Sequence, residues 1–385
     1  HVADESELPV NPLSKLPTIK CECGECDWEP EHDVMDTWAT SSLTPQISTD
    51  LVTGKGLDDT MIPMSLRPNA HDNIRVWDFY TIVKSLYHFG KLPWTDLMIS
   101  GYVTSSDGSK LSKKSGNNKN APQDIIAQYS ADVTRYWANN LSLGKDTCFS
   151  LESFDAGKKL ANKIWNASKF VLSFLYDYTP RQIDLLPMDK WILEKYKKVF
   201  KSFAKNLDRY DICLGLGEAE RFFWDFCDDY IELVKRRLYN PDVYGEKECE
   251  SAKYACYYTL LGILKMFAPF MPHITEEIYQ DYYAEKENQV SIHVSGYVDL
   301  GEAKDDDFVK AGDEVMQIVS GIRQFKSENK ISLKTFIKDL KVTSKYKDFI
   351  KSCEVDIKAV GSINELEVQD GDFNLKFGEI IPDAE

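Results

Sequence analysis

The sequence lacks the features that would place it in a membrane or in a secreted, disulfide-rich class. It has no run of eighteen apolar residues and no signal-peptide-like apolar segment near its start. Six of its nine cysteines stand singly, as at Cys213, Cys227 and Cys256. Isolated cysteines in apolar stretches are typical of reduced thiols. We therefore expect a cytoplasmic, monomeric protein without a membrane-bound part.

Positive charge is also scarce, because 46 lysines and arginines stand against 62 acidic residues, for a net charge of -16. That balance argues against nucleic-acid binding over the whole surface. A local basic face is still compatible with it. Between residues 101 and 122, four lysines accompany the single acid Asp107.

The chain of 385 residues is too long for one compact domain of ordinary size. From residue 33 to about 145, short apolar runs such as 97–103 alternate with helical patterns at 74–89 and 122–140, which indicates α/β structure with a parallel sheet. After residue 150, long amphipathic patterns at 188–207, 212–238 and 247–267 predict a helical bundle.

Apolar residues at steps of three and four define one face of the first bundle helix, namely Leu160, Ile164, Ala167, Val171 and Leu175. Beyond residue 301, a helical pattern at 306–329 precedes β-branched runs at 337–342, 355–360 and 366–368. These runs predict three strands in a small α/β appendix.

The most informative stretch, residues 101–117, reads GYVTSSDGSKLSKKSGN. A strand opens here into a polar loop with closely spaced lysines. Ammonium groups can neutralise a polyphosphate, and glycine and serine allow close approach of the backbone. Taken alone, the stretch could equally be a solvated surface loop.

The longer string resembles the second signature, KMSKS, of class I aminoacyl-tRNA synthetases, with Leu111 in place of Met and Lys114 in place of the final Ser. The downstream Asp132 and Arg135 also match that class. The resemblance implies a loop that closes over ATP, with Mg²⁺ expected alongside. It implies catalytic roles for Lys110, Ser112 and Lys113, and ATP contacts from Gly101, Tyr102, Lys110 and Lys113.

Two further blocks bear on the amino acid that is activated. Residues 33–42 read DVMDTWATSS, which resembles the valine enzymes of this class more than the isoleucine enzymes, and residues 71–77 read HDNIRVW. The resemblance implies an amino-acid pocket at Trp38, Asn73 and Trp77. A rigid aromatic slot excludes larger side chains by steric overlap. Each tryptophan could instead be ordinary core packing.

Three cysteines are packed into six residues as Cys21-x-Cys23-x-x-Cys26. Structural zinc needs four ligands, and Cys23 and Cys26 have the spacing of half a site. The resemblance implies a zinc knuckle whose other half would lie upstream. The alternative is three uncoordinated thiols.

Residues 160–170 (LANKIWNASKF) and 268–277 (APFMPHITEE) resemble the anticodon-binding bundle of the same class. Anticodon bases are read by stacking and edge contacts, while basic side chains hold the phosphates. Lys235, Arg236 and Arg237 end a predicted helix and are candidates for binding tRNA. They could equally complement the helix dipole.

The resemblance implies a mixed fold: a zinc-knuckle remnant or linker (1–32), the second half of a Rossmann-like nucleotide-binding domain (33–149), an anticodon-binding bundle (150–300) and an α/β appendix (301–385). The implied activity is ATP-dependent activation of valine and its transfer to tRNA(Val). Two alternatives remain, an isoleucine enzyme and a non-catalytic tRNA-binding module. No His-x-Gly-His string occurs, so we expect this chain alone to form no valyl-adenylate.

Overall fold

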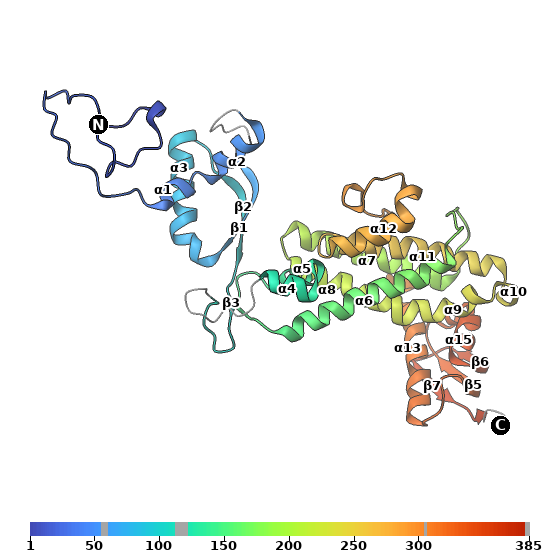
Figure 1. The fold of residues 1–385 in the computed structure, drawn as a ribbon. Coiled ribbons are helices and arrows are strands. Elements are labelled where there is room, and N and C mark those ends of the chain that lie inside the picture. The colour runs from blue at the N-terminus through green and yellow to red at the C-terminus, as the bar shows by residue number, and fades with distance from the viewer. Residues whose placement is uncertain (55–60, 112–121, 304–305, 382–385) are drawn as a thin grey trace. The chain divides into compact units, whose positions relative to one another are not determined.

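The computed structural model describes residues 1–54, 61–111, 122–303 and 306–381, and the chain forms two compact units (Figure 1). The N-terminal unit is His1–Gly101 and the C-terminal unit is Tyr102–Glu385. Each unit is described by itself. None of the described helices is both long and apolar enough to cross a membrane.

The N-terminal unit begins with a loop-rich segment whose one regular element is the 3₁₀ turn η1 (Glu5–Glu7). Two parallel strands follow later in the unit, with helices between them. The pairing joins β1 to β2, from Met64 opposite Trp94 to Ala70 opposite Ser100. The elements after η1 are α1 (Thr37–Ser41), α2 (Thr44–Thr53), β1 (Met64–Ala70), η2 (His71–Asn73), η3 (Ile74–Asp78), α3 (Phe79–Phe89) and β2 (Trp94–Ser100).

The C-terminal unit starts with a short parallel pair, β3 (Val103–Thr104) and β4 (Thr147–Cys148), and continues as a helical bundle. The bundle and the helices that lead into it are α4 (Pro122–Tyr129), α5 (Ala131–Asn139), α6 (Leu151–Phe174), α7 (Pro187–Asp208), α8 (Ile212–Trp224), η4 (Asp225–Tyr230), α9 (Ile231–Tyr239), α10 (Pro241–Tyr244), α11 (Glu246–Phe267), α12 (Pro272–Glu287) and η5 (Ile292–Val294).

The bundle core confirms the predicted apolar face of α6, because Leu160, Ile164, Ala167, Val171 and Leu175 are all buried in it. Helix α11 is the most enclosed element, with fifteen of its residues buried. Burial of apolar surface at this density is the main force that holds such a bundle together.

The appendix comprises α13 (Asp306–Glu328), β5 (Phe336–Thr343), α14 (Lys347–Ser352), α15 (Glu354–Gly361), β6 (Ile363–Gln369), β7 (Asn374–Phe377) and β8 (Ile380–Ile381). Its sheet has β5 in the middle, parallel to β6 and antiparallel to β7 and β8. It packs on the bundle through α13, where a Cβ on Gly312 would lie 2.1 Å from Cδ1 of Trp191. Only glycine allows this close approach.

Three sequence predictions need correction. The strand expected at 355–360 is the helix α15, whose buried residues are Asp356, Ile357, Ala359 and Gly361. Packing of α15 against α9 and α13 outweighed its β-branched composition. The single helix expected at 122–140 is broken at Ser130, whose φ is 94°. The helix expected at 212–238 contains the π-helical segment η4.

The mixed architecture of α/β and helical parts is confirmed. By packing, residues 102–149 lie in the compact C-terminal unit, where α5 packs against α6. The proposed domain boundaries remain predictions.

Candidate functional site

The lysine-rich loop leaves the fold from a small hairpin at the start of the C-terminal unit. The Ser105 amide donates to the Ser109 carbonyl at 2.8 Å, and the Leu111 amide donates to the Val103 carbonyl at 3.1 Å. Gly108 turns the chain with φ of 81°. The segment that precedes residue 112 is therefore an ordered turn.

Asp107 organises this turn. Its Oδ1 accepts hydrogen bonds from the Ser105 hydroxyl, the Ser109 hydroxyl and the Ser109 amide, the last at 2.9 Å. These bonds lower the pKa of Asp107 to about 2, so the carboxylate is ionised at neutral pH. The only acid of the loop region is thus used within the turn.

Two of the predicted ATP-contacting residues lie together at the hairpin. The ammonium of Lys110 lies 3.8 Å from the centre of the Tyr102 ring, in a cation–π contact. The Tyr102 amide donates to Oδ1 of Asp146 at 2.7 Å. Gly101 ends the N-terminal unit. Ser112 and Lys113 lie outside the described residues, so their roles remain predictions.

Helix α5, which follows the loop, forms hydrogen bonds with the start of α12 and the residues before it, although these segments are far apart in the sequence. Both carboxylate oxygens of Asp132 accept backbone amides there, from His273 at 3.0 Å and from Ile274 at 2.7 Å. The guanidinium of Arg135 donates to the Pro269 carbonyl at 2.7 Å. A carboxylate at a helix N-terminus satisfies free amides and complements the helix dipole. The sequence matches Asp132, Arg135 and residues 268–277 to one class of protein, but no local pattern predicts the contact between them.

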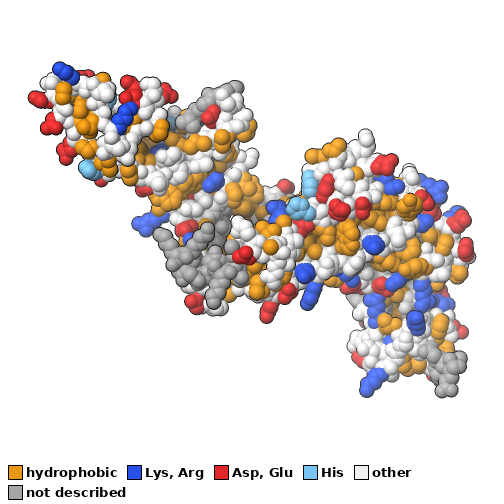
Figure 2. All heavy atoms as spheres, in the orientation of Figure 1, with side chains coloured by type: hydrophobic (Ala, Val, Ile, Leu, Met, Phe, Trp, Pro, Cys, Tyr) orange, Lys and Arg blue, Asp and Glu red, His pale blue; other side chains and the backbone are white. Residues whose placement is uncertain are grey.

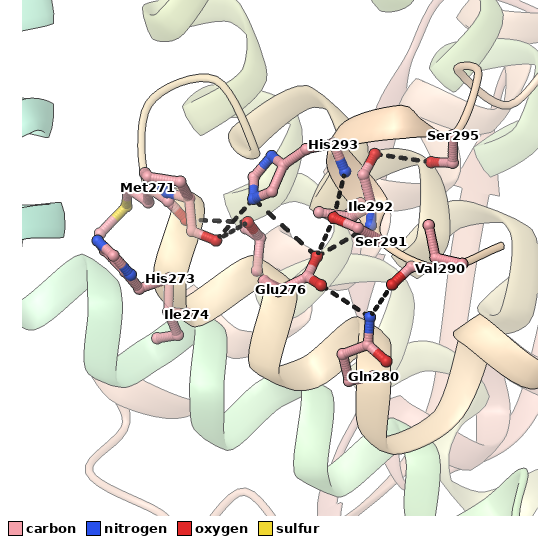
Figure 3. Close-up of polar contacts among 12 residues, drawn as sticks. Met271, His273, Ile274, Glu276, Gln280, Val290, Ser291, Ile292, His293 and Ser295 are labelled. Carbon is pink, nitrogen blue, oxygen red and sulfur yellow. Dashed lines mark hydrogen bonds and ion pairs between the residues drawn. The ribbon is translucent and has the colours of Figure 1, made fainter.

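Further along α12, Glu276 lies at the centre of a polar cluster (Figure 3). Its Oε2 accepts from the Ser291 hydroxyl at 3.0 Å and from the Ile292 amide at 2.9 Å, and Gln280 donates to its Oε1. Hydrogen bonds from Gln280, Ile292 and Ser291 outweigh burial and hold the pKa of Glu276 below its usual value. His293 contacts the Pro272 carbonyl at 3.2 Å. The cluster fastens residues 290–295 to α12.

In the N-terminal unit, the predicted pocket residues lie on elements that contact one another. Asp36 caps α1, since its Oδ1 accepts from the Trp38 amide at 3.0 Å. The indole of Trp77 donates to the Ser41 carbonyl at 3.0 Å, stacks on Trp94 with ring centres 5.6 Å apart, and lies under the Arg67 guanidinium. Trp77 is therefore packed in the interior, whereas Trp38 is half-buried.

Asn73 belongs to a chain of polar side chains next to Trp77. Its amide donates to Asn69 at 2.9 Å, and Asn69 donates to Oδ1 of Asp78 at 2.6 Å. Burial raises the pKa of Asp78, against the opposing effects of Asn69 and Arg67. The contacts account for a polar residue at position 73, and its contact with a substrate remains a prediction.

The cysteine cluster forms a tight turn in which the Cys23 amide donates to the Cys21 sulfur at 3.5 Å. Hydrogen bonds from Cys23 lower the pKa of Cys21. Cys23 and Cys26 are exposed and free. Among the residues that the structure describes, no three His, Cys, Asp or Glu side chains are placed to hold a metal ion. The zinc half-site remains a prediction.

The structure corrects one predicted tRNA contact, Arg237. Its side chain is buried and paired with two carboxylates, Asp189 at 2.9 Å and Asp356 at 2.8 Å. From its place in a basic run at a helix end, the sequence predicted an exposed side chain, but Arg237 points from α9 into the interior of the bundle. Its neighbour Arg236 donates to the Ser362 hydroxyl at 3.3 Å. Both arginines therefore fasten the appendix to α9.

Lys235 remains at the surface, paired with Glu232 at 3.1 Å and 5.5 Å from the centre of the Phe170 ring. Nearby, Tyr239 is 57% exposed and makes an edge contact with Phe174. A hollow between α6 and α12 is lined by Trp165, Ser168, Lys169, Leu172, Tyr176, Ile278, Asp281 and Tyr282. The C-terminal half of α6 therefore carries exposed aromatic and basic side chains together.

Charge of either sign is interspersed over the face of the bundle shown in Figure 2, where no large patch of lysine and arginine is visible among the described residues. This distribution agrees with the net charge of -16. On the face shown, a polyanion would be held by particular side chains and by stacking, and not by a broad basic surface.

Comparison with known families defines the class. The model described as "tRNA synthetases class I (I, L, M and V)" matches residues 5–150, and "Anticodon-binding domain of tRNA ligase" matches residues 189–342. The chain therefore belongs to the class I aminoacyl-tRNA synthetases. Within that class, its curated relatives include valine--tRNA ligases, as the motifs indicated.

The valine--tRNA ligase of Wolbachia pipientis wMel is 42% identical over 381 residues, which is 95% of this chain and 42% of the relative. That of Rickettsia conorii is 38% identical over 400 residues, or 98% of this chain and 48% of the relative. The chain thus spans about half the length of the curated relatives that it matches.

Among solved structures, the ternary complex of Agrobacterium radiobacter K84 agnB2 LeuRS with tRNA and LeuAMS covers 91% of this chain and 43% of its own, with a TM-score of 0.53 and 14% identity. Apo methionyl-tRNA synthetase of Mycobacterium tuberculosis covers 66% of this chain and 52% of its own, with a TM-score of 0.50 and 18% identity. At these identities the likeness concerns the fold alone.

Proposed function

We propose that this chain serves a valine–tRNA ligase, which activates valine with ATP and transfers it to tRNA(Val). The observation that carries the proposal is identity of 38–42% to valine--tRNA ligases along 95–98% of the chain. Isoleucine is the less favoured substrate. The deciding experiment is aminoacylation of tRNA by the natural protein with valine, isoleucine and threonine, and preferential charging of isoleucine would overturn the proposal.

The loop at residues 101–117 would act on ATP. In this proposal Lys110, which follows the ordered turn around Asp107, and Lys113 stabilise the charge that develops on the phosphates during adenylate formation. Mg²⁺ would neutralise phosphate charge when bound. In the natural protein, Lys113→Ala should lower adenylate formation about 100-fold or more, with Lys119→Ala as the matched control.

The C-terminal half of α6 would contact tRNA. It carries the exposed Trp165 and Lys169, the exposed Tyr176 follows its end, and Lys235 of α9 lies 5.5 Å from the ring of Phe170. Exposed rings stack on unpaired bases, and lysines pair with phosphates. Replacing both lysines by glutamine should weaken tRNA binding and lower its salt dependence by about two phosphate contacts. An unchanged salt dependence would remove these lysines from the interface.

A further inference from the structure

The short helix α1 carries the predicted pocket residue Trp38 and is held in place by few contacts of its own. It has only five residues, and a helix of that length is not stable by itself in water. None of its five side chains is buried, and Trp38 is half-buried. Because little apolar area is buried by α1, hydrogen bonds from neighbouring elements decide where it lies.

Two carbonyl groups near the end of α1 accept hydrogen bonds from η3 and α3. The Lys84 ammonium donates to the Ala39 carbonyl, and the Trp77 indole donates to the Ser41 carbonyl at 3.0 Å. Both carbonyls also accept from hydroxyl groups within their own segment. Carbonyls in the last turn of a helix lack an amide partner within it, and a cation there complements the helix dipole. The backbone of α1 is thus fastened to η3 and α3.

The donors share one face of the continuous helical segment formed by η3 and α3. Trp77, Thr81 and Ser85 are buried on this face, and Lys84 lies next to Ser85. The Thr81 hydroxyl donates to the Trp77 carbonyl at 2.7 Å, and Ser85 accepts from Gln46 of α2 at 3.3 Å. Helices α1 and α2 therefore both lie against this face through polar contacts.

The two donors to α1 are not equivalent. Trp77 is itself fixed, because its ring stacks on Trp94 and lies under the Arg67 guanidinium. Trp77 was also predicted to be a pocket residue. Lys84 was given no role by the sequence, although it bonds to the residue directly after Trp38.

We propose that Lys84 is a positioning residue for selection of the amino acid. It holds α1, and with it Trp38, against η3, so that the pocket predicted at these two elements keeps its width. Lys84 acts through α1 and does not touch the substrate. The inference rests on the proposed activation of valine and adds a residue that controls its selectivity.

The kinetic test compares Lys84→Met with Lys84→Arg in the natural protein, by valine-dependent ATP–pyrophosphate exchange. Methionine cannot donate a hydrogen bond, so α1 can shift, and a displacement of about 1 Å lowers catalysis up to about 100-fold. We expect kcat/KM for valine to fall about 10- to 100-fold, mainly through KM. The KM for ATP should stay unchanged.

Selectivity is the more specific readout. A pocket of fixed width discriminates against one extra methylene by about 10- to 200-fold, and a loosened pocket loses part of this. The preference for valine over isoleucine should fall at least about fivefold in Lys84→Met. Lys84→Arg keeps a cationic donor and should restore both the preference and the KM.

Lys20→Met removes an exposed lysine from the same unit and is the matched control, with no expected change. If Lys84→Met lowers the activity with valine and isoleucine equally and leaves both KM values unchanged, Lys84 acts on stability alone and the inference is wrong, while the proposed function stands. If the unmodified natural protein does not activate valine, the proposed function fails before any variant is compared, and the inference fails with it.

A second measurement does not depend on activity. In the 385-residue chain, Lys84→Met should speed deuterium exchange of the amides at 38–43 at least about tenfold, while the amides of α3 and α11 keep their rates. Unchanged exchange at 38–43 would overturn the proposal, because Lys84 would then not hold α1. Equal acceleration throughout α3 would also overturn it, because Lys84 would then stabilise the whole unit and not the position of α1.

Discussion

The two units are built on different interiors. Among the described residues of the N-terminal unit, the buried apolar side chains are Ile62, Trp77, Trp94 and the prolines Pro45 and Pro93, while the buried polar ones are Ser42, Gln46, Thr49, Asp78, Thr81 and Ser85. The C-terminal unit holds one large apolar cluster that spans the bundle and the appendix. Stabilisation grows with the apolar area buried. The bundle is therefore held by packing, whereas the N-terminal unit uses hydrogen bonds that fix side chains in position.

The largest difference should appear in local stability. Backbone amides of α3, in the N-terminal unit, should exchange with deuterium at least about 100-fold faster than those of α11, because little apolar area is lost when α3 opens. Hydrogen-exchange mass spectrometry of the whole chain measures both helices at once. Equal protection of α3 and α11 would contradict the comparison.

The C-terminal unit also contains buried charged side chains, among them that of Arg237. Replacing it by methionine keeps most of the volume but leaves Asp189 and Asp356 without their cation. The loss of one partner from a buried ion pair costs about 3–5 kcal/mol. We expect Arg237→Met to lower the free energy of unfolding of the C-terminal unit by that amount in urea titrations.

Arg236→Met is the matched control, because Arg236 lies next to Arg237 on α9 and its guanidinium makes a neutral hydrogen bond to Ser362. Its loss should cost about 1 kcal/mol. Equal effects of the two substitutions would mean that Arg237 is not held by the carboxylates.

The sequence predicted the parts of the fold that depend on local pattern. The period of three and four along α6 identified its buried face, and the motif around Lys110 identified the loop. It failed at Arg237 and α15, where the environment is set by other elements. A basic run at a helix end looks exposed in sequence, but the carboxylates that bury Arg237 come from residues 189 and 356. The contact of Asp132 with the start of α12 also joins residues too far apart for any local pattern to reveal.

A smaller effect on the free energy of unfolding should come from the pH-dependent ionisation of Asp356. Burial raises its pKa from 3.8 to about 6, although Arg237 lowers it. The folded state therefore binds a proton more readily than the unfolded state does. Stability from this group is fully present below about pH 4 and is lost as the pH rises through about 6, by about 2–3 kcal/mol in total.

The check for Asp356 is the difference between two stability curves. Asp356→Asn removes the titrating group, so the gap in unfolding free energy between this variant and the unmodified chain should change between pH 4 and 7. The gap should be largest near neutral pH, where the unmodified chain carries the buried charge. A gap independent of pH would show that Asp356 is not the titrating group.

The smallest effect on the free energy of unfolding is expected for a substitution of Gln46. This residue tests the comparison of the two interiors in the N-terminal unit. Gln46 is fully buried, donates one hydrogen bond of 3.3 Å to Ser85, and has an Oε1 without a partner. Gln46→Met has nearly the same shape, removes the unpaired oxygen and forfeits one long hydrogen bond, so the two changes nearly cancel. The free energy of unfolding should change by less than about 1 kcal/mol, because methionine at position 46 leaves no ion unpaired. Replacement of Arg237 by methionine does leave ions unpaired, and its cost should be several times larger. A loss at Gln46 as large as that at Arg237 would mean that the polar interior stabilises the N-terminal unit directly.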